Sequence, residues 1–119
     1  MGNIGGDSGN IGSDGTVTTA QAYVYVENVS GTPTIRYEFN VSSITDSGVG
    51  NFVVNFRNAL ASDDYSITGN ASASGSSAVS LYENTSVSRT SSSVPVKTSI
   101  APTSTLLDAA RWGIHVFGG

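Results

Sequence analysis

Apolar and polar residues alternate along much of the chain, and this period of two is typical of half-buried β-strands. The alternation is clearest over 35–41, where the intervening positions are charged or polar. The apolar members of this stretch are Ile35, Tyr37, Phe39 and Val41. One apolar face and one solvated face predict a strand of an antiparallel sheet.

This predicted strand leads into a β-hairpin. After Ile44 the chain reads Asp-Ser-Gly-Val-Gly over 46–50, and its glycines supply the positive φ angles that tight hairpin loops need. Apolar residues then return at every second position of 52–56. Two strands that bracket such a loop are expected to pair with each other.

Shorter alternating stretches predict further strands, separated by turn residues at intervals of about 8–12 residues. The stretches are 22–26, 65–67, 79–81, 94–98 and 112–117. Pro95 has no backbone N–H, which predicts that its strand lies at a sheet edge. Residues 106–110 are expected to form one helical turn. The fold expected for 18–119 is therefore a single all-β domain, an antiparallel β-sandwich or jelly-roll-like domain of about eight or nine short strands.

Residues 1–17 differ from the rest of the chain because they are rich in glycine. They contain a short tandem repeat in which Ile4 and Ile11 are the only apolar residues. Glycine costs about 1 kcal/mol relative to alanine in a helix, so the repeat is not a coiled-coil seam. It predicts an extended Gly-rich arm. The arm is either a flexible tail or a segment that orders against a neighbouring subunit, with both isoleucines as anchors.

Neither face of the strand at 22–26 is strongly polar. Ala22, Val24 and Val26 lie on one face. Tyr23 and Tyr25 lie on the other. Such a strand is expected to be covered on both sides or to lie at a subunit contact. The candidate subunit interface therefore comprises Tyr23, Val24, Tyr25, Val26, Ile4 and Ile11.

Charge and composition narrow the classes of partner. The chain has five basic and nine acidic residues and a pI near 4.5, so binding to nucleic acid or to an anionic membrane is not expected. No apolar run approaches the roughly 20 residues that span a bilayer. Residues 1–17 lack the basic start and apolar segment of an export signal. The protein is expected to leave a cell by lysis rather than by secretion.

No group of residues matches a catalytic or metal-binding pattern. The chain has no cysteine and one histidine, His115, which is expected to be structural or simply exposed. Most carboxylates fall in predicted turns, where aspartate bonds its own backbone. Asp63 and Asp64 are adjacent, so in an extended chain their side chains point apart and do not build a calcium shell. The protein is expected to be non-enzymatic, without a cofactor or metal.

One stretch is longer and more continuous than an isolated motif. From Phe39 to Phe56 it reads FNVSSITDSGVGNFVVNF. It resembles a motif in the C-terminal domains of tail-fibre-like virion structural proteins of tailed bacteriophages, many of which infect cyanobacteria. The similarity continues in AYVYV at 22–26 and in ALASDDY at 59–65. The resemblance implies a virion surface protein, assembled in the host cytoplasm, usually a homotrimer and often involved in host attachment.

Three functions remain open from the sequence. The first is a tail-fibre-like subunit on the exterior of the virion that binds polysaccharide or protein of the host surface. The second is a capsid decoration, or cement, protein whose short arm spreads over the shell. The third is a lectin-like or carbohydrate-active module in which aromatic residues stack on sugars. The candidates for stacking are Tyr23, Tyr25, Tyr82 and Trp112. Other virion proteins and further copies of the chain are the expected partners.

Overall fold

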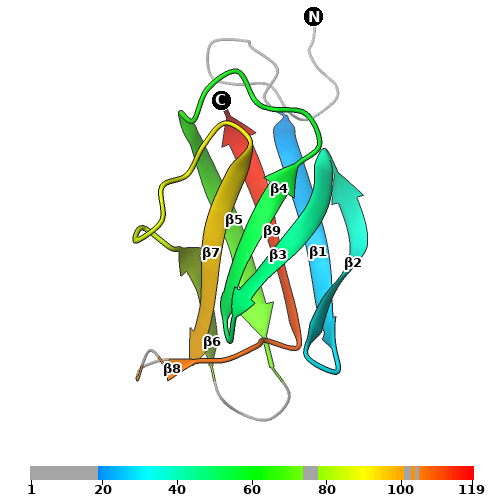
Figure 1. The fold of residues 1–119 in the computed structure, drawn as a ribbon, viewed down its shortest axis with the longest axis vertical. Helices are drawn as coiled ribbons and strands as arrows, with labels where there is room; N and C mark the ends of the chain where they lie inside the picture. The colour runs from blue at the N-terminus through cyan, green and yellow to red at the C-terminus, as the bar shows by residue number, and fades with distance from the viewer. Residues whose placement is uncertain (1–18, 74–77, 101–102, 104) are drawn as a thin grey trace, which may run out of the picture.

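The alternating stretches fold into two antiparallel sheets that pack face to face (Figure 1). The computed structural model describes residues 19–73, 78–100, 103 and 105–119. This part of the chain contains nine strands and no helix. The predicted all-β sandwich is confirmed, whereas the helical turn predicted at 106–110 is wrong. The predicted arm, with Ile4 and Ile11, lies outside the described residues.

The first sheet has four strands in the order β2-β1-β9-β5. Their bounds are Ala20–Val29 for β1, Thr32–Phe39 for β2, Tyr65–Ser72 for β5 and Arg111–Gly118 for β9. The late strand β9 therefore lies between β1 and β5. Its register places His115 between Tyr23 and Thr68.

The second sheet has the order β3-β4-β7-β6, and the short strand β8 also pairs with β7. The bounds are Val41–Gly48 for β3, Asn51–Phe56 for β4, Val79–Glu83 for β6, Ser93–Ile100 for β7 and Thr105–Leu106 for β8. Thr45 pairs with Val53 across the turn between β3 and β4. The predicted hairpin is thus confirmed in this sheet.

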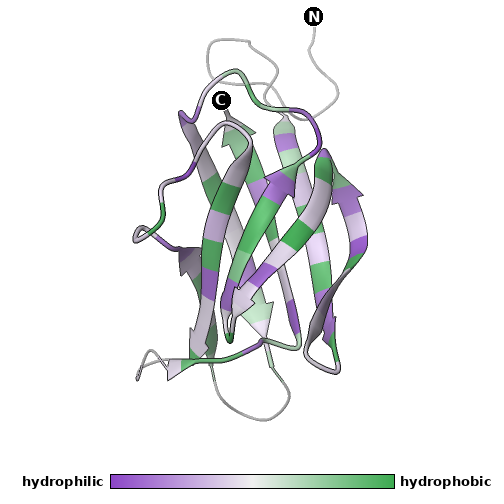
Figure 2. Cartoon of the chain, in the orientation of Figure 1, coloured by the Kyte–Doolittle hydropathy of each residue, from purple (hydrophilic) through white to green (hydrophobic). Residues whose placement is uncertain are grey.

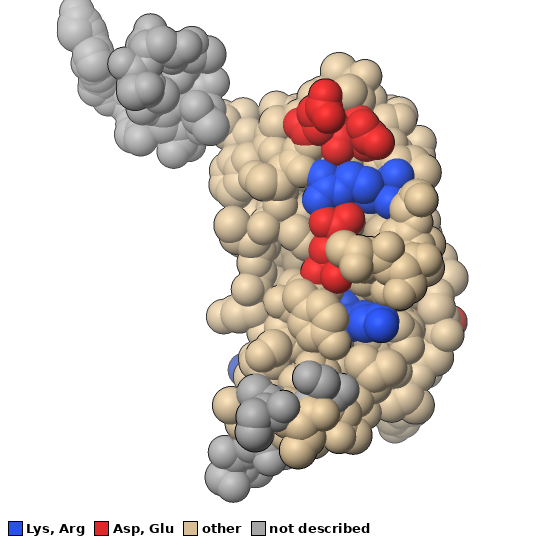
Figure 3. All heavy atoms as spheres, turned by 90° about the vertical axis from the view of Figure 1, so that its left-hand side faces the viewer, with Lys and Arg blue, Asp and Glu red and all other residues tan. Residues whose placement is uncertain are grey.

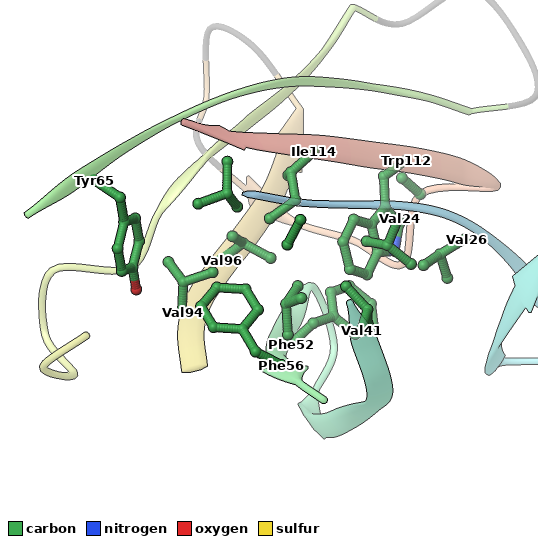
Figure 4. Close-up of a cluster of buried hydrophobic side chains, with 14 residues drawn as sticks. Val24, Val26, Val41, Phe52, Phe56, Tyr65, Val94, Val96, Trp112 and Ile114 are labelled. Carbon is green, nitrogen blue, oxygen red and sulfur yellow. The ribbon is translucent and has the colours of Figure 1, made fainter. Parts of the chain in front are cut away.

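The core lies between the sheets and is filled by inward-facing residues from both (Figure 4). Trp112 of β9 stacks on Phe52 of β4 with ring centroids 5.1 Å apart, which joins the two layers. Burying a large apolar side chain stabilises a fold by about 1.5–3 kcal/mol. Apolar and polar bands alternate along the strands in Figure 2, as this packing requires. The buried apolar residues are Ala22, Val24, Val26, Val41, Phe52, Val54, Phe56, Tyr65, Val94, Val96, Ala109, Trp112, Ile114 and Val116.

The single strand predicted at 35–41 is instead two strands in different sheets. Between the end of β2 and the start of β3, Asn40 has a φ of 57°. Asparagine tolerates this left-handed conformation better than most residues. Its amide nitrogen donates to the Asn58 carbonyl at 3.1 Å, and its amide oxygen accepts from the Asn58 N–H at 2.8 Å. The chain therefore changes sheets at one residue.

A β-bulge in β2 places two predicted core residues on the outside. Ile35 packs against the core, but Tyr37 lies opposite the outward-facing Tyr25, and Arg36 is the extra residue. One extra residue reverses the face to which the following side chains point. Tyr37 and Phe39 are therefore 65% and 50% exposed, and the prediction that they share a buried face with Ile35 is wrong.

Pro95 lies in a central strand, so the prediction of an edge strand is also wrong. Its strand β7 pairs with β4 on one side and β6 on the other. The Pro95 carbonyl accepts a hydrogen bond from the Asn84 N–H at 2.9 Å, so the proline nitrogen faces the same side. Because β6 ends at Glu83, the missing donor falls where the ladder is already ending.

Gly50 anchors the β3–β4 hairpin to the second half of the chain. Its N–H donates to Oδ1 of Asp108 at 2.8 Å, and its carbonyl accepts from the Thr98 N–H at 3.0 Å. A Cβ atom at Gly50 would lie 2.6 Å from the Thr98 carbonyl oxygen and 2.9 Å from the backbone of Leu107. The position therefore has no room for a side chain.

Gly50→Ala is expected to lower the free energy of unfolding more than Gly31→Ala. Both glycines have positive φ, 68° and 81°, which costs alanine about 1–2 kcal/mol at either site. Nothing lies within 4 Å of a Cβ at Gly31, whereas the methyl group at Gly50 also collides with backbone and adds about 1–3 kcal/mol. Urea unfolding of the two variants measures the difference. Equal losses would contradict the proposed close packing.

Candidate functional site

The outer face of the first sheet carries five neighbouring aromatic side chains. The strand register places Phe39, Tyr23 and His115 side by side on β2, β1 and β9. The Tyr23 ring centroid is 5.7 Å from that of Phe39 and 5.6 Å from that of His115. Tyr37 lies 5.7 Å from Tyr23, and Phe117 lies 6.5 Å from His115. We call these five residues the aromatic row.

A groove interrupts the outer face beside the aromatic row, where Gly113 has no side chain to fill the space between neighbouring residues. Gly113 of β9 lies between Tyr25 of β1 and Asn70 of β5. A Cβ atom at Gly113 would lie 2.8 Å from the carbonyl oxygen of Val24, so the close approach of β1 and β9 requires glycine. The resulting Gly113 groove has a volume of about 520 Å³. Its polar walls include Tyr25, Asn70, Ser72, Arg111 and His115.

Charged side chains border one end of the Gly113 groove. Glu27 accepts hydrogen bonds from the Tyr25 hydroxyl at 2.6 Å and from Nε of Arg36 at 3.0 Å. These two bonds hold the pKa of Glu27 below its ordinary value. Nε of Arg111 lies 3.8 Å from the same carboxylate, and the Arg111 side chain is 66% exposed. Two guanidinium groups beside one carboxylate make this end of the groove positively charged.

The residues predicted for a subunit interface lie in two different environments. Tyr23 and Tyr25 lie on the outer face, in the aromatic row and at the Gly113 groove. Val24 and Val26 are buried in the core of their own domain. They have no surface to offer a neighbouring subunit, which corrects their assignment to the interface. The physical reason is the alternation of the strand, because one face of β1 packs against the second sheet.

The remaining stacking candidates lie elsewhere. Trp112 is buried in the core, and Tyr82 is 40% exposed on β6 of the second sheet. Sequence reasoning missed Tyr37, Phe39 and Gly113 as site residues. The alternation over 35–41 assigns the first two to the core, and it takes the bulged register of β1 and β2 to show that they face outward. The role of Gly113 in the groove depends on the pairing of β1, β9 and β5. A local sequence pattern does not reveal that pairing.

A second polar cluster ties the loop after β6 to β5, on the face shown in Figure 3, where acidic and basic side chains gather in one column. Nε of Arg89 donates to Oε2 of Glu83 at 2.9 Å, and the guanidinium carbon lies 4.2 Å from the centre of the Tyr65 ring. The Tyr65 hydroxyl lies 2.9 and 3.0 Å from the carbonyl oxygens of Thr90 and Ser93. Burial raises the pKa of Tyr65 to about 12. These contacts give the cluster a structural role.

The described part of the chain also bears on metal binding and membrane crossing. Among the described residues, no group of three or more histidine, cysteine, aspartate or glutamate side chains is placed to hold a metal ion. Asp63 and Asp64 are both exposed in the loop before β5. The ranges that the structure describes include no helix of the length and apolarity needed to cross a membrane.

No family model, curated protein or solved structure matches the chain. The aromatic row and the Gly113 groove together form the candidate functional site, and both lie on the outer face of the first sheet. Their aromatic rings, amide and guanidinium groups are suited to recognition by stacking and hydrogen bonding.

Glu83→Gln is expected to lower stability at neutral pH by about 1 kcal/mol and to lose this effect in acid. The hydrogen bond from Arg89 holds the pKa of Glu83 below 4.5. A carboxylate with a depressed folded-state pKa stabilises the fold above its unfolded pKa, and this contribution disappears as the pH falls through the folded value. Urea unfolding at pH 7 and at about pH 3 tests whether the free energies of unfolding of the wild type and the variant converge in acid.

Glu38→Gln provides the matched control for this measurement. The Glu38 carboxylate pairs with Arg57 at 2.9 Å, but that arginine side chain is 55% exposed. Its substitution is expected to change stability less at neutral pH, because exposed ion pairs contribute little. A Glu83→Gln deficit that is the same at both pH values would contradict the electrostatic role of the Arg89 pair.

Proposed function

We propose that this protein is a structural protein displayed on the exterior of a virus particle, where the outer face of its first sheet contributes to host attachment. The exposed aromatic row carries this proposal. Contiguous apolar rings on a surface usually mark an interaction site, because a partner removes them from water. The bulge at Arg36 turns Tyr37 and Phe39 outward, so their exposure is built into the strand.

The sandwich supports a recognition role for this face. The aromatic row lies on β2, β1 and β9, and the inner faces of these strands pack on the second sheet. Side chains on such a scaffold lose little conformational freedom when a partner binds, which favours affinity. The aromatic row is therefore preorganised for contact, because its strands are already held in place before a partner binds.

The sequence supports the viral setting. Residues 39–56, which resemble the hairpin motif of tail-fibre-like virion proteins, begin at the last residue of β2 and include all of β3 and β4. These strands belong to the second sheet and supply part of the inner layer on which the first sheet rests. In this proposal β3 and β4 of the motif belong to the scaffold, and the opposite sheet, which includes Phe39, provides the contact with the host.

Replacing both Tyr37 and Phe39 by serine is expected to slow adsorption of particles to host cells by about ten-fold or more, as for loss of central aromatic contacts. The copy number of the chain per particle, measured by quantitative mass spectrometry, is expected to stay unchanged. Tyr82→Ser, at an exposed tyrosine of the second sheet, is the matched control and should adsorb normally.

Two results would count against this function. Normal adsorption of the double variant would remove the aromatic row from host attachment. Loss of the double variant from otherwise intact particles would show that the row holds the subunit on the particle, as a decoration protein requires.

A further inference from the structure

We infer that the Gly113 groove binds one ring of an extended saccharide, while the aromatic row supports neighbouring rings. This inference rests on the proposed role in host attachment and names its ligand class. A sugar ring presents apolar C–H faces and a rim of hydroxyl groups. Its site therefore needs aromatic surface beside side chains that donate and accept hydrogen bonds.

The groove has a suitable size and position. Its volume of about 520 Å³ lies within the range of about 300–1,000 Å³ that is common for small-molecule sites. On one side Tyr25 connects it to the aromatic row, and on the other Asn70 belongs to β5, an edge strand of the sheet. A ligand longer than one ring can therefore continue from the groove over the aromatic row, while its other end reaches the edge of the sheet.

The walls of the groove carry hydrogen-bonding groups of both kinds. The Asn70 amide donates and accepts, and the two ring nitrogens of His115 add further hydrogen-bonding positions. The Tyr25 hydroxyl donates to Glu27, so its oxygen accepts, while Arg111 offers donors. Sugar hydroxyl groups can form hydrogen bonds with all four of these side chains. An apolar partner would instead offer no hydrogen bonds to Asn70 and His115, at a cost of about 1–3 kcal/mol for each polar group that is buried unpaired.

The aromatic row adds apolar surface next to these walls. Its successive centroids, from Phe39 through Tyr23 to His115, are 5.7 and 5.6 Å apart. These separations exceed the roughly 3.5–4.0 Å of direct face-to-face carbon contact, so the faces of neighbouring rings are not in full contact with one another. Because the three rings stand on three adjacent strands, they form a line on which successive sugar rings can lie.

Charge at the groove distinguishes two sources of such a ligand. Arg36 and Arg111 face a single carboxylate, Glu27, and Arg111 is the more loosely held of the two. A uronic acid would place its carboxylate against Arg111, which forms strong charge-assisted bonds. A neutral sugar would use the same donors for its hydroxyl groups. Both ligands share the ring and the hydroxyl rim, and the experiment separates them.

Affinity electrophoresis of the full chain tests this inference. Native gels contain a neutral galactomannan, a neutral xylan or the uronate polymer alginate, and retardation yields a dissociation constant. The wild-type chain is expected to be retarded in at least one gel. Asn70→Ala is expected to weaken that binding by about five-fold, the effect of one hydrogen bond. Arg111→Gln is expected to weaken binding more strongly if alginate is the polymer that binds.

Control measurements show whether weaker binding has a cause other than the lost contact. Asn70 lies exposed on an edge strand, so thermal melting of Asn70→Ala should match the wild type. Tyr82→Ser alters an exposed tyrosine of the other sheet and should bind as the wild type does. Gly113→Ala is avoided as the main variant, because its Cβ would press on the backbone of β1.

The outcomes distinguish this inference from the function on which it rests. No retardation of the wild type in all three gels, or equal retardation of wild type and Asn70→Ala, overturns the saccharide site. Adsorption that still depends on Tyr37 and Phe39 would then leave host attachment standing. Saccharide binding with normal adsorption of that double variant would retain the site and refute the attachment role. A change of mass for Asn70→Ala in sedimentation velocity would overturn the inference in favour of a contact between copies.

Discussion

Burial of one face of β1 and β9 against the second sheet is the constraint on which the rest of the structure depends. Side chains alternate along a strand, so burial of Val24 directs Tyr23 and Tyr25 outward, and burial of Ile114 directs His115 outward. The inner face is selected for packing, and its residues are accordingly branched, small or aromatic. The outer face points away from the second sheet. Aromatic rings that gather there therefore lie outside the core, and the proposed recognition surface is separate from the scaffold.

The fold class could be predicted from the sequence because alternation is a local property. The β3–β4 hairpin followed in the same way from Gly48 and Gly50 between two apolar stretches. Two features escaped prediction because each depends on one residue that looks ordinary in sequence. Asn40 turns the chain from one sheet to the other, and Arg36 adds a residue that inverts the faces of β2. The edge-strand prediction drawn from Pro95 is wrong for a related reason, since the effect of a proline depends on where the neighbouring strand ends.

The candidate site was visible in the sequence only in part. The outward Tyr23 and Tyr25 follow from the alternation of their strand, and their apolar character marks the face as unusual. The groove cannot be predicted from the alternation of one strand. It exists because Gly113, which has no side chain, is paired with Tyr25 and Asn70 on two other strands. Strand register is set by long-range pairing, so a site assembled across strands becomes visible only with the structure. The charges at its end, from Glu27 and Arg111, are brought together by the same pairing.

The position of β9 between β1 and β5 also determines when the proposed binding surface can form. During synthesis, β1, β2 and β5 emerge long before Gly113 and His115, and the first sheet stays divided until β9 is inserted. Contacts between residues so distant in sequence form slowly, because a long loop must close first. The groove and the continuous row consequently cannot form before β9 is in place. A nascent or misfolded chain that lacks this strand has neither feature in full, which couples the proposed binding surface to completion of the fold.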